Sequence, residues 1–108
     1  MTFEVNFFKQ ECVKVLEEIS HLEHAVRNGV MTYAALIVLI SEAEETYKNA
    51  YGRYADIIST DVYFNEQCQA FGGELENLAK KVKNGAITQV SLIETLQRLL
   101  NFSNVVLN

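Results

Sequence analysis

Two short stretches of the sequence decide the fold: VRNGVMT at residues 26–32 and VKNGAIT at residues 82–88. Each places an Asn-Gly pair at the end of an amphipathic pattern, and a threonine three residues after the glycine. Glycine tolerates the left-handed backbone that ends many helices, and a threonine hydroxyl can accept a hydrogen bond from the first free amides of the next helix. Both stretches therefore predict a helix end, a tight turn and a new helix.

The two stretches belong to a longer match between two parts of the chain. Residues 5–40 align without a gap with residues 61–96, and ten of the 36 positions are identical. Matched apolar residues alone prove little, because amphipathic helices share periodic patterns. The matched cysteines, Cys12 and Cys68, and the matched Asn-Gly-x-x-Thr segments are more specific. We therefore interpret the chain as a duplicated helical hairpin.

Apolar residues recur along four segments at alternating steps of three and four, which places them on one face of a helix. The stripes are Val5, Phe8, Cys12, Val15, Ile19, Leu22 and Val26; Leu36, Ile40, Ala43, Tyr47, Ala50, Tyr54 and Ile57; Phe64, Cys68, Phe71, Leu75, Leu78 and Val82; and Leu92, Leu96, Leu99 and Val106. Short connections favour antiparallel neighbours. The sequence predicts one all-α domain over residues 1–108, an antiparallel four-helix bundle of two duplicated hairpins (residues 3–57 and 60–107) with pseudo-two-fold symmetry.

The connection between the two hairpins has two candidate positions. The β-branched and polar run at residues 57–62 weakens a helix and offers capping side chains, which favours a break near Thr60. Alternatively, the second helix continues to Phe71 and breaks at Gly72-Gly73, since each glycine inside a helix costs about 1 kcal/mol relative to alanine. If the glycines lie inside a helix, they mark a kink or a close helix crossing.

Composition and charge argue against several functional classes. The chain has nine basic and 14 acidic residues, a formal net charge of −5, and no basic face of the kind that nucleic acids require. Its longest uncharged apolar run, residues 30–40, is about half the length that spans a bilayer. The first ten residues lack a signal-peptide pattern, and two cysteines suggest a reducing compartment. We expect a cytoplasmic protein without a nucleic-acid or membrane partner.

Familiar catalytic and ligand-binding patterns are not found in the sequence. Glu18 and His21 have the spacing of half a di-iron motif, but the matched residues Glu74 and Asn77 lack the second histidine. The two cysteines lie in apolar stripes, where a free thiol behaves as a small hydrophobe. Glycine-rich phosphate loops and serine-centred elbows are also missing. We expect no enzymatic activity, no cofactor and no metal.

The two halves differ in how apolar their second helix is. Val38 and Leu39 align with Glu94 and Thr95, so the first half carries apolar side chains at positions that are polar in the second. An amphipathic helix does not need apolar residues on all sides. We interpret the difference as a partner or oligomer interface, with tyrosine and glutamate nearby. The candidate residues are Met31, Tyr33, Val38, Leu39, Glu42, Glu45 and Tyr51. The alternatives are a more central second helix and tyrosines at the edge of the core.

One hairpin resembles a known family. Residues 75–100, LENLAKKVKNGAITQVSLIETLQRLL, resemble the helix–Gly–Ile–Ser/Thr–helix stretch of small bacterial immunity proteins of the colicin D type. The resemblance implies a helical bundle of similar length. It also implies a function, because members of that family block a toxin nuclease by covering its active site, partly with acidic groups. No individual functional residue is transferred by the resemblance.

These observations lead to one expected function and two alternatives. We expect a non-enzymatic module that binds another protein: a small inhibitor, immunity protein, antitoxin or phage-encoded antagonist that masks its partner. Acidity suits a partner with a basic surface. The first alternative is a bundle that binds a small molecule between its helices, with Cys12, Cys68 and Tyr47 in the lining. The second is a self-assembling structural protein, for which a homodimer is the simplest form.

Overall fold

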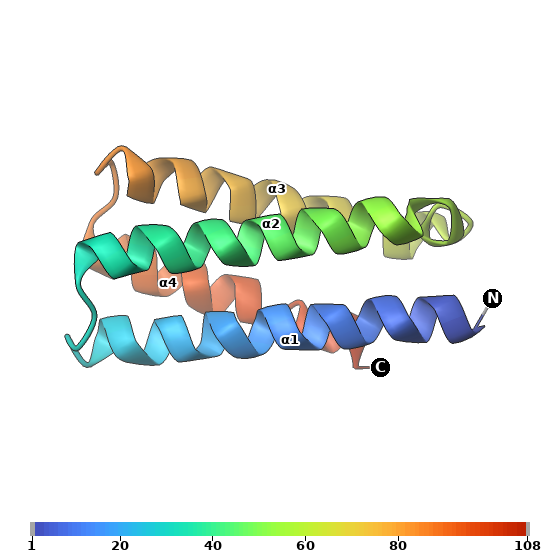
Figure 1. The fold of residues 1–108 in the computed structure, drawn as a ribbon, viewed down its shortest axis with the longest axis horizontal. Coiled ribbons are helices and arrows are strands. Elements are labelled where there is room, and N and C mark those ends of the chain that lie inside the picture. The colour runs from blue at the N-terminus through green and yellow to red at the C-terminus, as the bar shows by residue number, and fades with distance from the viewer. Residues whose placement is uncertain (1, 108) are drawn as a thin grey trace.

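The computed structural model describes residues 2–107, and the side chains of residues 4–107. These residues form helices α1 (Thr2–Arg27), α2 (Tyr33–Ile58), α3 (Val62–Lys83), α4 (Gln89–Leu100) and α5 (Ser103–Val106), and no strand. The chain reverses direction at each connection between the four long helices, and the α1–α2 and α3–α4 turns lie at the same end (Figure 1). The helices share one hydrophobic core, so the all-α prediction is confirmed and the packing is compatible with a bundle.

The two Asn-Gly turns have the same backbone geometry. Gly29 and Gly85 have φ angles of 68° and 67°, the left-handed region that favours glycine. In each turn the amide after the glycine bonds back to a carbonyl five residues earlier, Val30 to Ala25 at 3.0 Å and Ala86 to Lys81 at 2.8 Å. This pattern satisfies the last free carbonyls of α1 and α3. The helix ends that the sequence predicted are confirmed.

The threonine caps also agree with the prediction. Thr32 Oγ1 accepts a hydrogen bond from the Ala35 amide, and Thr88 Oγ1 accepts one from the Ser91 amide, both at 3.1 Å. An N-cap hydroxyl of this kind contributes about 1 kcal/mol to helix stability. The starts of α2 and α4 are therefore fixed by local chemistry.

The connection between α2 and α3 lies at residues 59–61, as the polar run predicted. The Asp61 side chain caps α3 by accepting a hydrogen bond from the Phe64 amide at 3.0 Å. The alternative, in which the second helix continues to the glycine pair, is wrong. One detail of the second stripe is also corrected: Ile58, at 1% exposure, takes the core position predicted for Ile57, which is only half-buried.

Gly72 lies inside α3 at a close helix crossing. A Cβ atom added there would meet Cε2 of Tyr47 at 3.0 Å, whereas one added at Gly73 would meet nothing within 4 Å. The Tyr47 ring cannot easily move away from such a Cβ atom, because the side chain is buried and its hydroxyl donates a 2.6 Å hydrogen bond to the Cys68 carbonyl. Gly72 therefore makes room for Tyr47, and the packing gives no such role to Gly73.

The end of α4 differs from the prediction. Val106 was expected on the fourth helix, but α4 stops at Leu100 and Val106 lies on the separate turn α5. A continuous helix would place Ser103, four residues after Leu99, on the core face. The break instead buries Phe102, which stacks on Phe71 with ring centroids 4.3 Å apart. The core gains an aromatic residue in place of a serine.

Glu23 is the one charged residue buried among those described, at 5% exposure. Its carboxylate accepts hydrogen bonds from Arg27 at 2.7 Å and from Gln97 of α4 at 3.1 Å. The Arg27 bond, supported by the one from Gln97, lowers the pKa of Glu23 below its ordinary value of 4.5, although burial opposes the shift. The carboxylate therefore joins α1 to α4 in its charged form.

We predict that Gly73→Ala stabilises the fold and Gly72→Ala does not. The first should raise the free energy of unfolding by about 0.5–1 kcal/mol, because alanine favours the helix and has open space. The second should lower it by about 1–2 kcal/mol, because the added methyl group presses on Tyr47. Urea denaturation of the two variants measures both effects. Equal effects would contradict the close packing at Gly72.

We predict that Glu23→Gln removes a pH-dependent contribution to stability. Because the folded-state pKa is lowered, the contribution is present above pH 4.5 and is lost as the pH falls through the folded-state value. At pH 7 the variant should be about 1–2 kcal/mol less stable than the wild type, and the gap should narrow below pH 4.5. Chemical denaturation at a series of pH values between 7 and below 4.5 measures this difference in stability. Glu66→Gln, at an exposed position, is the control. A gap that does not depend on pH would contradict the assignment.

Candidate functional site

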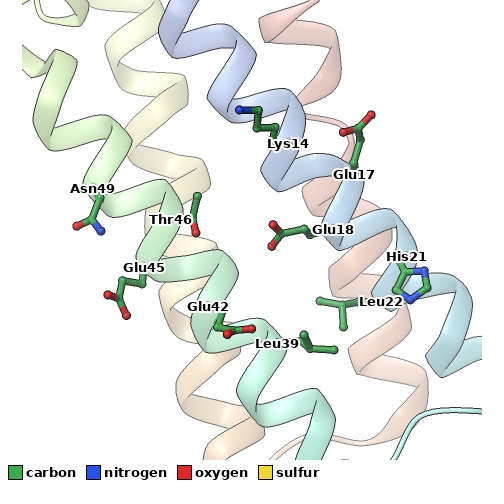
Figure 2. A pocket seen from close by; sticks show the side chains of 10 residues that line it. All are labelled: Lys14, Glu17, Glu18, His21, Leu22, Leu39, Glu42, Glu45, Thr46 and Asn49. Carbon is green, nitrogen blue, oxygen red and sulfur yellow. The ribbon is translucent and has the colours of Figure 1, made fainter.

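An open surface groove of about 880 Å³ lies between α1 and α2 (Figure 2). Short turns place these two helices side by side, so residues far apart in sequence face one another across the groove. It is lined by Lys14, Glu17, Glu18, His21 and Leu22 of α1 and by Leu39, Glu42, Glu45, Thr46 and Asn49 of α2. The groove therefore combines aliphatic, hydroxyl and charged side chains from both members of the first hairpin.

The groove has an aliphatic base and acidic sides. Leu22 is buried, and Leu39 is half-buried and packs against the core. Figure 2 shows Glu18 directed from α1 and Glu42 directed from α2 into the space between the helices. Both glutamates are exposed to solvent. The arrangement offers carboxylate acceptors above a small apolar surface.

Among residues 4–107, no ion pair is formed by the four carboxylates of the groove. Its lining carries four carboxylates and a single lysine ammonium group. Lys14 forms its ion pair along its own helix, with Glu11 at 3.9 Å, and its side chain is 68% exposed. Among the ten lining residues, no ion pair or side-chain hydrogen bond joins α1 to α2. Glu18 and Glu42, which enter the groove from opposite helices, therefore form no ion pair with another described residue.

Three other contacts between the long helices have polar links. Lys48 of α2 pairs with Glu76 of α3 at 3.1 Å. Arg98 of α4 pairs with Glu74 of α3, with Nε and Oε1 2.8 Å apart. Gln97 of α4 bonds to Glu23 of α1, as described above. The groove between α1 and α2 is thus the helix contact at which acidic groups gather without such a link.

Four of the seven candidate interface residues lie on or beside this groove. Leu39, Glu42 and Glu45 line it. Val38 follows the same outward face of α2 as Glu42 and Glu45, at steps of four and seven, and is 55% exposed. These four residues come from one face of one helix and form a continuous surface.

The other three candidate residues lie elsewhere. Met31 is half-buried in the α1–α2 turn and packs against the core. Tyr33 lies at the same end of the fold, where its hydroxyl donates to the Val82 carbonyl at the end of α3. Tyr51 faces α3, and its hydroxyl donates to Asn65 Oδ1 at 2.5 Å. The structure does not bring these three together with Val38 and Leu39.

Sequence reasoning missed the α1 side of the groove. Lys14, Glu17, Glu18, His21 and Leu22 were not among the candidate interface residues. A usable signal was present, because Glu42 lies two residues beyond the aligned segment and corresponds to Arg98 in the other half. Extending the alignment by two residues would have shown a glutamate where the second hairpin has an arginine.

The residues proposed to line a small-molecule site are packed inside the core. Cys12 and Cys68 are free thiols with exposures of 1% and 0%. Burial raises the pKa of both, to about 12 for Cys68. Tyr47 is also buried, and its hydroxyl is bonded to the Cys68 carbonyl. Within residues 2–107, no three histidine, cysteine, aspartate or glutamate side chains are placed to share a metal ion.

Comparison with known proteins gives no relative: no family model, curated protein or solved structure matches the chain. None of the helices formed by the described residues has the length and apolar character needed to cross a bilayer. The functional argument therefore depends on the chemistry of the groove.

We predict that Val38→Glu and Leu39→Thr have different effects, although the second half carries these residues at the matched positions. Val38→Glu should change the free energy of unfolding by less than about 0.5 kcal/mol, because the side chain is exposed. Leu39→Thr should lower it by about 1 kcal/mol or more, because Leu39 packs against the core. Chemical denaturation of the single variants checks both values. A large loss from Val38→Glu would contradict its placement on the surface.

Proposed function

We propose that this protein is a non-enzymatic protein-binding module of the inhibitor, immunity-protein, antitoxin or phage-antagonist kind, which masks a partner protein. The observation that carries the proposal is the α1–α2 groove, where Glu18 and Glu42 enter from opposite helices beside Leu22 and Leu39 and form no ion pair with another described residue. The proposal assigns no catalytic residue, cofactor or metal, and it places the protein in the cytoplasm.

The groove's chemistry defines the kind of partner. Carboxylates above an aliphatic base favour a surface that combines basic and apolar side chains, because complementary charges steer association and suppress wrong partners. Val38 extends the apolar area beside the groove, and burying it would contribute about 1.5 kcal/mol or more. A nuclease, whose substrate-binding surface is basic, is a partner of this description. A second copy of the chain is a weaker match, because it would bring another acidic groove.

We also infer that the antiparallel bundle arose by duplication of one hairpin. The two turns share their φ angles and hydrogen bonds. The matched residues Phe8 and Phe64 touch, with ring centroids 6.1 Å apart and an interplanar angle of 88°, as residues near a pseudo-two-fold axis would. Duplication gives each position of the first hairpin a counterpart in the second. A position that differs between them is then a candidate for function.

We predict that a partner is captured through the groove. Immobilised wild-type protein should retain the partner from a lysate of the cells that express it, and Glu18→Gln/Glu42→Gln should reduce the retained amount about ten-fold or more, because two charge-assisted contacts are lost. The matched control is Glu66→Gln/Glu94→Gln, which removes two exposed carboxylates outside the groove. Mass spectrometry identifies and quantifies what is retained.

The control decides how the capture result is interpreted. A partner that binds the wild type and the control but not the groove variant would support the proposal. Equal retention by all three proteins would show that another surface binds the partner. If the wild type retains no partner and instead assembles with itself, the masking function is wrong.

A further inference from the structure

The two hairpins differ in the charge of one position that faces the neighbouring helix. In the second hairpin, Arg98 of α4 donates through Nε to Glu74 of α3 at 2.8 Å. Fifty-six residues earlier, the matched positions are Glu42 of α2 and Glu18 of α1. The first hairpin therefore has two carboxylates where the second has a carboxylate and a guanidinium group.

The charge difference leaves a place for a cation in the groove. Glu18 and Glu42 both point into the space between α1 and α2, and like charges that face each other are destabilising (Figure 2). Arg98 shows that a guanidinium group can bridge, at the surface, two helices connected by this kind of turn. It also approaches Thr95, whose counterpart is Leu39. At the matched positions, the first hairpin therefore has a leucine in place of a threonine and a glutamate in place of an arginine.

Arginine suits this place better than lysine. Its planar guanidinium group has five N–H donors and can bind two carboxylates at once, whereas the lysine ammonium group is a compact, strongly hydrated charge. The methylene groups of an arginine would lie on Leu22 and Leu39 at the base of the groove. Lys14, the only basic residue of the lining apart from His21, is engaged with Glu11.

We propose that the partner inserts an arginine side chain into the α1–α2 groove, with its guanidinium group between Glu18 and Glu42, as Arg98 approaches Glu74 in the second hairpin. This inference rests on the proposed function, since it names the group through which the partner is held. It assigns Glu18 and Glu42 as the ligands and Leu22 and Leu39 as the surface beneath the arginine.

The first test introduces an arginine at position 42, which corresponds to Arg98 of the second hairpin. Glu42→Arg should pair with Glu18 and raise the melting temperature by about 1–5 °C. Adding Glu18→Gln to the Glu42→Arg variant should remove this gain in melting temperature. Adding Glu18→Gln to a Glu42→Gln variant should change the melting temperature little. Glu66→Arg, which makes the same charge change on exposed α3 surface, should show no dependence on Glu18. A Glu42→Arg gain that does not depend on Glu18 would overturn the geometry.

The second test uses a small probe of known chemistry. N-acetyl-arginine-amide is titrated into ¹⁵N-labelled protein at low ionic strength, with N-acetyl-citrulline-amide as the uncharged control. We expect saturable shifts of backbone amides around Glu18, Leu39 and Glu42 with the arginine compound, at least about ten-fold stronger binding than with citrulline, and no binding to Glu42→Arg. Equal binding of the two compounds, or shifts spread over the whole surface, would overturn the inference.

The outcomes separate the inference from the proposed function. A partner captured through the groove in the absence of an arginine-specific site would leave the protein-binding function in place and overturn the arginine contact. An arginine-specific site at Glu18 and Glu42 with no captured partner would establish the site's chemistry but overturn the masking function, and with it the partner's arginine contact. Because the probe measurement needs no partner, neither result depends on the other.

Discussion

The structure depends on two glycines that hold a left-handed backbone, Gly29 and Gly85. Each lets a helix end with its carbonyls bonded and lets the chain return within a few residues, so that amphipathic helices meet along their apolar faces. Both turns lie at the same end of the fold (Figure 1). A side chain at either glycine would strain the turn, because residues other than glycine rarely adopt this backbone conformation.

The core and the polar surface contacts then have separate roles. The apolar stripes bring the four helices together, while single polar links such as Lys48–Glu76 and Glu74–Arg98 join particular neighbours at the surface. Exposed ion pairs of this kind contribute little to stability, so their presence or absence is free to vary. In the first hairpin, Glu18 and Glu42 occupy the matched positions and form no such link.

Much of the fold could be predicted from the sequence, because local chemistry decides it. The Asn-Gly turns, the threonine caps and the three-four apolar steps each act within a few residues, and they placed the helix ends correctly. The end of α4 could not be predicted this way, since the stacking of Phe102 on Phe71 is a long-range contact that overrides helical continuity. The groove itself was not predicted. Comparison of the two halves indicated Leu39, and the nearby tyrosines indicated Glu42 and Glu45, whereas the α1 residues needed the pairing of two helices in space. Tyr51 was a candidate interface residue, but its hydroxyl donates a hydrogen bond to Asn65 of α3.

On the proposal above, the acidic groove and Val38 form a surface for a different protein and not for a second copy of this chain. The most direct measurement is the solution mass by light scattering, at high micromolar concentration, for the wild type and for Val38→Glu. We expect the mass of one chain, 12.2 kDa, for both proteins, because two acidic grooves repel each other. A stable wild-type dimer that Val38→Glu dissociates would contradict the claim, since a second copy would then cover the surface proposed for the partner.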